Sequence, residues 1–516
     1  MRDTGVVNVG PEPLTFDDVI KVARHGAPVR LTDDAMAAVA AARQRVDELA
    51  ESPVPAYGVS TGFGALATRH IDPALRAQLQ RSLVRSHAAG NGPEVETEVV
   101  RALMLLRLHT LATGHTGIRP TTAKTLAAVL SAGITPIVHE YGSLGCSGDL
   151  APLSHVALTL MGEGVVRDST GNVTEAAEAL KQAGIDPVEL AAKEGLALIN
   201  GTDGMLGMLV MAIDDLNKLV RTADVSAAMS VEALLGTDRV FAPELQALRP
   251  HPGQAAAAAN MTRILAGSGI MASHRDPENC TRVQDAYSLR CAPQVAGAAR
   301  DTIAHATTVA TWELASAVDN PAVLADGRVE SNGNFHGAPI GYVLDFLAIV
   351  AADLASMSER RTDRFLDVAR NHGLPAFLAD DPGVDSGHMI AQYTQAAIVS
   401  ELKRLAVPAS VDSIPSSAMQ EDHVSMGWSA ARKLRRSVDG LTRVLAIEVL
   451  TAARALDLRR PLTPAPATAA VVDALRETVP GPGPDRFLAP EIDSAVRLVA
   501  DGAVVEAVES VTGPLA

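Results

Sequence analysis

Aromatic residues are scarce in this chain of 516 residues, which has eight Phe, five Tyr and two Trp, together 3% of the sequence. Hydrophobic residues nevertheless make up 47%, so the core must be built mainly from Ala, Leu, Val and Ile. This composition favours closely packed helices. A chain of this length can bury a large core, which excludes peptides and single small modules.

Cysteine and positive charge are also scarce. The three cysteines, Cys146, Cys280 and Cys291, are too few for a disulfide framework and indicate reduced thiols in a reducing compartment. Lys and Arg number 44 against 60 Asp and Glu, which gives a net charge of −16. No global basic field is therefore present that would bind nucleic acid or an anionic membrane.

The sequence shows no clear targeting or membrane-spanning segment. The first 20 residues contain no basic start followed by an apolar run, so a secretory signal is not expected. The most apolar later stretch, residues 341–352, is interrupted by Asp345 and is shorter than the roughly 20 residues needed to cross a bilayer. We therefore expect a cytoplasmic protein that binds neither membrane nor nucleic acid.

The common cofactor motifs are missing as well. The chain has no Walker loop and no HExxH, and none of its 14 histidines lies three to five residues from another. Gly62-Phe63-Gly64 is only half of a dinucleotide fingerprint, without a strand, helix and strand around it. We expect neither a metal nor a nucleotide cofactor.

Helical patterns, by contrast, occur almost throughout the sequence. Thr32 is placed to cap a helix, and Asp72-Pro73 is placed to open another one that stops before Gly90. Strand patterns are few and short, the candidates being residues 196–200 and 327–332. Longer helical patterns cover residues 94–113, 204–235, 284–317, 339–367 and 421–458.

These lengths predict a mainly α fold with a long central helical bundle and a smaller N-terminal region. Residues 1–200 contain shorter helices and more Gly and Pro, whereas residues 201–460 carry the long helices. Two proline-rich breaks, at 461–467 and 479–485, interrupt a last region that runs from 461 to 516. We expect three regions with these boundaries, and the last is a helical tail.

Residues 139–164 form the most informative segment, because three glycines there frame Cys146-Ser147-Gly148. One interpretation is an ordinary turn in which Ser147 caps the following helix. In the other, the nitrogen of Gly148 attacks the carbonyl of Cys146, since Gly has no Cβ to block the approach. Loss of water from the ring, and of the Ser147 hydroxyl as a second water, would leave an imidazolone with an electrophilic exocyclic methylene.

A second glycine-rich segment, YGVSTGFG at residues 57–64, begins with Tyr57. A flexible surface loop is one interpretation of this composition. A mobile lid that carries the Tyr57 phenol to a pocket is the other.

Together the motifs resemble those of a known family. They are YGVSTGFG, GSLGCSGDLAPLSH, ALINGTDGM, VQDAYSLRCAPQV, VDNP with ESNGNFHGAP, and SSAMQEDHVSMGW. In this order, from about residue 55 to 460, they are similar to the signatures of the aromatic amino acid ammonia-lyases, and in particular of the histidine-specific members.

The resemblance implies a mostly helical homotetramer in which each active site is assembled from three subunits. It also implies the methylidene-imidazolone (MIO) cofactor, formed autocatalytically from Cys146, Ser147 and Gly148. The expected reaction converts L-histidine to trans-urocanate and ammonia, the first step of histidine degradation.

The resemblance also assigns catalytic roles. Tyr57 would be the base that removes the weakly acidic β-proton, and Ser147 would supply the electrophile that activates the amine as a leaving group. Asn200 would hydrogen-bond near the MIO carbonyl and the substrate, where the motif alone predicts only a cap. Phe335 would pack beside the cofactor, first of all as structural support.

Gln284, Tyr287 and Arg290 are spaced by three, so on a helix they share one side. A polar surface of a helix is one interpretation of this spacing. By resemblance, Arg290 binds the substrate carboxylate with two hydrogen bonds, while Gln284 and Tyr287 line the pocket and Tyr287 also takes part in catalysis.

Two positions would determine the substrate. His87, after Ser86, resembles the residue of the histidine-specific members, and so does Glu421, where phenylalanine-specific members carry Gln. An imidazole needs polar partners at both ring nitrogens, and a carboxylate accepts from one N–H. Glu421 could also be only a charge in the first turn of a helix.

Two departures from the family pattern are present. Cys146 replaces the commoner Ala, and Asp203-Gly204 stands where many members carry Gln. The alternatives are a tyrosine or phenylalanine ammonia-lyase or an aminomutase of the same family, and a helical scaffold without activity.

Overall fold

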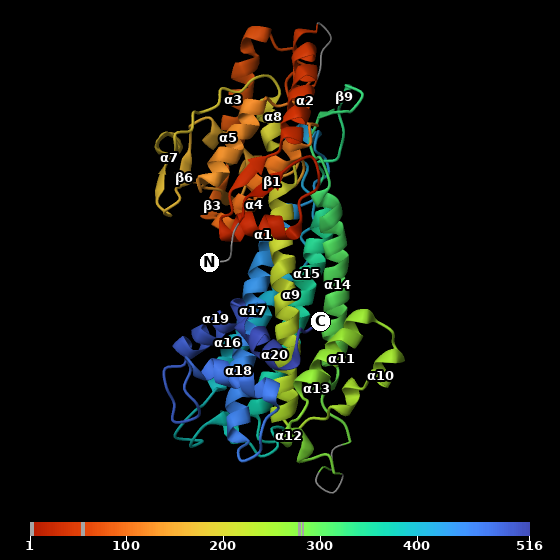
Figure 1. The fold of residues 1–516 in the computed structure, drawn as a ribbon, viewed down its shortest axis with the longest axis vertical. Coiled ribbons are helices and arrows are strands. Elements are labelled where there is room, and N and C mark those ends of the chain that lie inside the picture. The colour runs from red at the N-terminus through yellow and green to blue at the C-terminus, as the bar shows by residue number, and fades with distance from the viewer. Residues whose placement is uncertain (1–4, 53–56, 277–279, 281–282) are drawn as a thin grey trace. The chain divides into compact units, whose positions relative to one another are not determined.

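The computed structural model describes residues 5–52, 57–276, 280 and 283–516. This part of the chain forms 20 α-helices and nine strands of two to four residues (Figure 1). The expected mainly α fold is confirmed.

The chain divides into two compact units. The first unit comprises residues 1–211, 307–345 and 408–432, and the second unit comprises residues 212–306, 346–407 and 433–516. Each unit is therefore built from three separate segments of the sequence. The division into regions 1–200, 201–460 and 461–516 follows chain order and stays a prediction.

The first unit contains the shorter helices of the N-terminal half. These helices are α1 (Phe16–His25), α2 (Asp33–Glu51), α3 (Arg76–His87), α4 (Thr97–Ala112), α5 (Pro120–Ser131), α6 (Leu150–Leu160), α7 (Ala176–Ala183) and α8 (Glu194–Ile199). It also contains the short 3-10 helices η1 (Gly64–Leu66), η2 (Pro73–Leu75) and η5 (Ser417–Met419).

All nine strands lie in the first unit as small pairings. The parallel pair is β1 (Val7–Val9) with β2 (Val29–Leu31). The antiparallel pairings are β3 (Asn91–Glu94) with β5 (His139–Tyr141), β4 (Thr135–Pro136) with β6 (Val165–Arg167) and β7 (Val173–Glu175), and β8 (Ala322–Val323) with β9 (Val329–Glu330). The strand predicted at 327–332 is confirmed as β9.

The helices that lie wholly in the second unit are mostly short. They are α10 (Pro243–Ala247), α11 (Pro252–Ile264), α12 (Gly269–Ala272), α13 (Tyr287–Arg290), α16 (Met389–Leu405), α18 (Pro466–Arg476), α19 (Ala489–Ala500) and α20 (Ala503–Thr512), with the 3-10 helices η3 (Arg239–Phe241) and η4 (Ala376–Leu378).

The four longest helices have residues in both units. They are α9 (Asp203–Ala233), α14 (Ala292–Leu314), α15 (Ala338–Leu366) and α17 (Gly427–Leu458). The helices predicted at 204–235 and 339–367 are confirmed almost to the residue. Those predicted at 284–317 and 421–458 begin later, at residues 292 and 427.

Within the second unit, buried polar contacts join these long helices. Glu448 of α17 accepts hydrogen bonds from Ser226 (2.9 Å) and Ser230 (2.7 Å) of α9 and pairs with Arg361 of α15 (2.5 Å). Asp224 of α9 pairs with Arg300 of α14 (2.6 Å). Because an unpaired buried charge is costly, these contacts restrict how the helices pack in this unit.

Helix caps follow the predicted residues in two places. The Thr32 side chain accepts from the Ala35 N–H at the start of α2. The Asp72 side chain accepts from the Ala74 N–H, and the helix beyond it ends at His87.

The strand predicted at 196–200 is wrong, because residues 194–199 form helix α8. All six residues of α8 are buried. A short apolar run that is buried on every side has no periodicity to separate helix from strand. Lys193, at φ +68°, is the N-cap of this helix, and Asn200 is its C-cap.

Helix α15 is longer than the apolar stretch considered from the sequence. Among the described residues it is the one helix long and apolar enough to cross a membrane, with a mean hydropathy of 1.7 over 18 residues. Of that window, 67% is buried inside the structure. Core helices of globular proteins have the same length and composition, so this feature is weak evidence for a membrane span.

Candidate active site

Cys146, Ser147 and Gly148 lie in the first unit, between β5 and α6. Gly148 has φ +75°, and a Cβ built on it would lie 2.1 Å from the carbonyl oxygen of Gly201. The neighbouring Asp149 N–H donates to the same carbonyl at 2.7 Å. Only glycine fits at position 148, because both the backbone conformation and the space exclude a side chain.

Asp149 connects this segment to the start of α9. Its buried carboxylate accepts from the N–H groups of Gly204 and Met205 and from the Ser143 hydroxyl, each at 2.9 Å. Burial raises the pKa of Asp149 to about 7, against the opposing effect of these hydrogen bonds. Ser147 does not cap α6, whose N-cap residue is Asp149.

Glu421 lies beside the Cys146–Gly148 segment. The Ser147 hydroxyl is 3.5 Å from Oε1 of Glu421, and the Ser416 hydroxyl donates to Oε2 at 2.9 Å. Glu421 pairs with Ser416 through the backbone and precedes α17 by six residues, so the interpretation as a first-turn charge is wrong. Burial, and then the charge of Glu421, raises the pKa of the Cys146 thiol to about 12, which keeps that thiol neutral.

His87 is the last residue of α3 and is half-buried. Burial lowers the pKa of His87, and the negative charge of Glu421 acts in the opposite direction. The Ser86 hydroxyl lies 3.1 Å from Nδ1 of His87. Glu421 is therefore near enough to His87 for its charge to affect the pKa of the imidazole.

Tyr57 lies in a loop that is folded back on itself. The Gly64 N–H donates to the Tyr57 phenol oxygen at 3.2 Å, and the Gly62 N–H donates to the Arg69 carbonyl at 3.0 Å. A Cβ on Gly64 would lie 3.2 Å from the Ser417 hydroxyl oxygen. The Tyr57 loop thus reaches the segment that carries Glu421.

The segment that carries Glu421 contains a run of backbone conformations that the sequence did not predict. Ser417, Ala418 and Met419 all have positive φ values, from +51° to +68°. Such conformations are uncommon for residues with a Cβ, and they concentrate at functional sites where the surrounding structure holds them.

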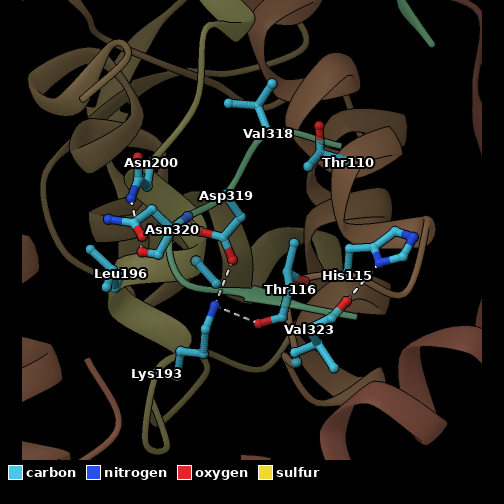
Figure 2. A network of polar contacts seen from close by, with 12 residues as sticks. Thr110, His115, Thr116, Lys193, Leu196, Asn200, Val318, Asp319, Asn320 and Val323 are labelled. Atoms are coloured by element: carbon cyan, nitrogen blue, oxygen red, sulfur yellow. Dashed lines mark hydrogen bonds and ion pairs between the residues drawn. The ribbon is translucent and has the colours of Figure 1, made fainter. Parts of the chain in front are cut away.

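Asn200 is buried at the end of α8. Its Nδ2 donates to the Asn320 carbonyl at 3.0 Å (Figure 2). Its Oδ1 is buried and has no hydrogen-bond partner among the described residues. An acceptor left in this way is available to a donor that the protein chain does not supply.

Phe335 is half-buried and lies in the loop that precedes α15. Two residues later, the Gly337 N–H points to the Gly145 carbonyl at 3.4 Å, and that carbonyl also accepts from the Ser425 hydroxyl at 2.8 Å. The loop that carries Phe335 is therefore attached next to Cys146.

Gln284, Tyr287 and Arg290 lie in the second unit. Gln284 precedes the four-residue helix α13. The prediction that Gln284 shares one side of a helix with Tyr287 and Arg290 is therefore wrong. The Arg290 guanidinium carbon lies 4.6 Å from the centre of the Tyr287 ring. Gln284 and Arg290 line a cavity of about 360 Å³ within this unit.

The predicted site residues thus form two groups. Those in the first unit are Tyr57, His87, Cys146, Ser147, Gly148, Asn200, Phe335 and Glu421, and those in the second unit are Gln284, Tyr287 and Arg290. The sequence did not assign Ser416 or Asp149. Asp149 could have been found, since it directly follows the predicted cyclising residues, and Ser416 could have been found as the first residue of the motif SSAMQEDHVSMGW.

Comparison with known proteins gives the family of this chain. A model of the aromatic amino acid lyase family matches residues 14–477. The chain belongs to the aromatic amino acid lyase family. The expected family is confirmed, and the chain is an enzyme of the carbon–nitrogen lyase class.

Among its relatives in the aromatic amino acid lyase family are proteins named histidine ammonia-lyase. One from Streptomyces avermitilis is 69% identical over 511 residues and covers 99% of both chains. Another, from Sorangium cellulosum, is 50% identical over 98% of this chain and 99% of the relative.

Solved structures of the family have the same fold. The histidine ammonia-lyase from Trypanosoma cruzi superposes with a TM-score of 0.90 at 38% identity, covering 98% of this chain and 96% of that one. The tyrosine aminomutase from Streptomyces globisporus gives a TM-score of 0.92 at 39% identity, covering 98% and 99%. The fold alone therefore does not separate the reactions within this family.

Proposed function

We propose that this chain is an MIO-dependent histidine ammonia-lyase that converts L-histidine to trans-urocanate and ammonia in the cytoplasm, as the first step of histidine degradation. The observation that carries the proposal is the position of Glu421, whose carboxylate lies 3.5 Å from the Ser147 hydroxyl and acts on the charge of His87. A relative that is 69% identical to this chain is named histidine ammonia-lyase.

The residues at 146–148 fit the cofactor. Gly148 has no room for a side chain, so no Cβ hinders the attack by its nitrogen. The Ser147 hydroxyl, which donates to Oε1 of Glu421 at 3.5 Å, can leave as water. The Cys146 side chain takes no part, because only its backbone carbonyl enters the ring. When formed, the MIO supplies an electrophilic methylene that makes the substrate amine a better leaving group.

In the first unit, Tyr57 is the proposed base for the β-proton of the substrate. The hydrogen bond from the Gly64 N–H holds the phenol oxygen in place. The loop around Tyr57 lies next to the segment that carries Glu421, because Gly64 of the loop is close to Ser417. The proposed base and the residue that selects the substrate therefore lie on neighbouring parts of the chain. Asn200 contributes its unpartnered Oδ1 as an acceptor, and Phe335 would pack beside the cofactor.

In the second unit, Arg290 is the proposed partner of the substrate carboxylate, because a guanidinium can donate two parallel hydrogen bonds to it. Its Nε has no hydrogen-bond partner among the described residues. Gln284 lines the same cavity as Arg290, and the Tyr287 ring lies beside the Arg290 guanidinium.

Substrate selection rests on His87 and Glu421. A carboxylate accepts from one imidazole N–H. A phenyl ring would supply no such donor to the half-buried Glu421 carboxylate, whose Oε2 accepts from the Ser416 hydroxyl. The discrimination against phenylalanine is expected to reach several kcal/mol, by analogy with other sites that recognise a polar group on the substrate.

The second candidate is a tyrosine-specific or phenylalanine-specific enzyme of the same family, such as an aminomutase. The superposition with the tyrosine aminomutase at a TM-score of 0.92 is compatible with it. The carboxylate of Glu421 beside Ser147 argues for the imidazole substrate instead.

The proposed enzyme is a homotetramer with active sites shared between subunits. Large apolar side chains are exposed on α15 and α16 of the second unit, including Phe346 (45%), Ile349 (47%), Ile390 (58%) and Tyr393 (60%). Exposed apolar side chains of this size are typical of protein–protein contacts.

A substrate panel tests the proposed function. The purified enzyme is incubated with L-histidine, L-tyrosine and L-phenylalanine, and the ultraviolet absorbance of each unsaturated product is followed. We expect urocanate as the main product, and the absence of urocanate would contradict the proposal. Ser147→Ala should keep the oligomer and lose turnover, and borohydride should inactivate the unsubstituted enzyme.

A further inference from the structure

A buried ion pair between Lys193 and Asp319 lies close to Asn200 in the first unit. The Lys193 ammonium is 2.5 Å from Oδ2 of Asp319, and both side chains are fully buried. The ammonium also donates to the Thr116 carbonyl at 2.7 Å. Figure 2 shows this pair and the residues around it.

Contacts at both ends of helix α8 lead to the short segment that contains Asp319 and Asn320. Lys193 is the N-cap of α8 and Asn200 is its C-cap. Oδ1 of Asp319 accepts from the N–H of the next residue, Asn320, at 2.9 Å. The Asn320 carbonyl in turn accepts from Nδ2 of Asn200, so a closed loop of contacts runs from Lys193 to Asn200.

This loop of contacts determines how the Asn200 amide is oriented. Because Nδ2 is directed to the Asn320 carbonyl, Oδ1 is the atom left without a partner among the described residues. Asn200 directly precedes Gly201, whose carbonyl accepts from Asp149 next to Gly148. A shift of Asn320 would remove the contact that fixes this orientation.

Stability alone does not explain the pair. The desolvation of two buried charges offsets most of their attraction, and apolar replacements of similar volume are often equally stable. The neighbouring Asn320 is also held by the Ser331 hydroxyl (3.0 Å) and the Asn332 N–H (2.9 Å), both on its Oδ1. Arg107 already joins the two elements by donating to the carbonyls of Asn200 and Val318. The pair adds a further connection, at the N-cap of α8.

We propose that Lys193 and Asp319 are positioning residues that hold the Asn320 carbonyl against the Asn200 amide and so present Oδ1 of Asn200 as an acceptor to the substrate side of the site. This inference rests on the proposed function, because it requires Asn200 to act in the reaction.

A double-mutant cycle tests it. Lys193→Met with Asp319→Asn removes both charges together and leaves no unpaired charge behind. We expect kcat/KM for L-histidine to fall by roughly 10-fold to 100-fold, as small displacements of a positioned group do. In an Asn200→Ala background the same double substitution should cost less than about threefold, because the residue it positions is absent.

A readout without turnover accompanies the cycle. In the Ser147→Ala variant, which cannot form the cofactor, the Kd for L-histidine is measured by calorimetry. Adding the double substitution should raise that Kd. Rates in the other variants are normalised to the fraction of chain that has lost two waters by intact mass.

The matched control is the ion pair of Asp224 and Arg300 in the second unit, where Asp224 is fully buried and Arg300 is largely buried. Asp224→Asn with Arg300→Met should change kcat/KM by the same factor with and without Asn200. Thermal unfolding and circular dichroism report whether each variant folds.

Three results would overturn the proposal. They are an unchanged kcat/KM in the Lys193 and Asp319 variant, a loss of equal size in both Asn200 backgrounds, and failure of this variant to fold while the control folds. If the wild type releases no urocanate, the proposed function fails instead. A fully active Asn200→Ala variant overturns this inference and the role of Asn200, while the proposed function stands.

Discussion

Gly148 combines two constraints that no larger residue meets. Its φ is +75°, and a Cβ would lie 2.1 Å from the Gly201 carbonyl oxygen. We therefore expect Gly148→Ala to displace the backbone and prevent cyclisation. Intact mass spectrometry should give the full sequence mass, and urocanate release should stop.

Gly171 provides the control for this substitution. It has φ +88° but no atom within 4 Å of a built Cβ. Gly171→Ala should cost only backbone strain, about 1 kcal/mol, and should keep both the mass deficit and the activity. A Gly148→Ala enzyme that still loses two waters would show that space at this position does not control cyclisation.

Glu421 is the residue at which substrate selection is most directly testable. Glu421→Gln keeps the shape and removes the charge, so a charge-assisted hydrogen bond to the imidazole of about 1.5–3 kcal/mol is lost. We expect kcat/KM for L-histidine to fall roughly 10-fold to 100-fold, whereas the rates with L-phenylalanine and L-tyrosine should not fall.

The exposed neighbour Asp422 is the control for Glu421, and Asp422→Asn should leave the substrate preference unchanged. Equal losses with all three amino acids in Glu421→Gln would indicate that Glu421 supports the fold of the site and does not select the substrate.

At the scale of single residues, the sequence indicated the residues that carry chemistry, because they lie in contiguous motifs. It did not indicate the partners that hold them. Lys193 and Asp319 are 126 residues apart in the sequence, and Ser416 is a serine among several in its segment. Contacts of this kind are set by tertiary structure, which local patterns do not contain.

At the scale of elements, the sequence predicted the existence and type of the long helices better than their ends. Caps with a clear chemical signal, such as Thr32, were correct. Helix α17 begins six residues after Glu421, because the backbone there pairs with Ser416. Helix α8 was mistaken for a strand, since burial on all sides removes the periodic pattern.

The junction of α16 and α17 in the second unit has a predicted pH dependence. His388, the N-cap of α16, is buried, with its Nδ1 3.1 Å from the Thr451 hydroxyl of α17. Burial, and then the charges of Arg454, Arg476 and Arg486, lower the pKa of His388 to about 3.

In the unfolded chain a histidine has a pKa of about 6.5, so unfolding takes up a proton between about pH 3 and 6.5. The free energy of unfolding should therefore fall as the pH drops through this range, by about 2 kcal/mol at pH 5 relative to pH 7.5. Urea unfolding at the two pH values measures this loss.

His388→Asn should lose less stability than the wild type between the two pH values, because it has no imidazole to protonate on unfolding. The exposed His25 is the control, and His25→Asn should keep the wild-type difference. A His388→Asn variant with the full wild-type difference would contradict this assignment.

At the scale of the whole molecule, the two groups of site residues allow a complementation experiment. Ser147→Ala alters the first unit and Arg290→Met alters the second, and each variant alone should be inactive. If active sites combine residues from different subunits, roughly a quarter of the sites in an oligomer that contains both variants should be active.

Separate affinity tags on the two chains isolate the mixed oligomer, and analytical ultracentrifugation gives its size. No activity in a mixed oligomer that contains both chains would contradict shared active sites. Activity in the Ser147→Ala homo-oligomer would contradict the role of Ser147 itself.

The measurement that tests the account most directly is the mass of the proteolytic peptide that contains residues 146–148, taken from freshly purified active enzyme. We predict a peptide that is lighter than its sequence by two waters, with the change localised to Cys146, Ser147 and Gly148 by fragmentation. An unmodified peptide from an enzyme that releases urocanate would contradict the proposed cofactor and the mechanism built on it.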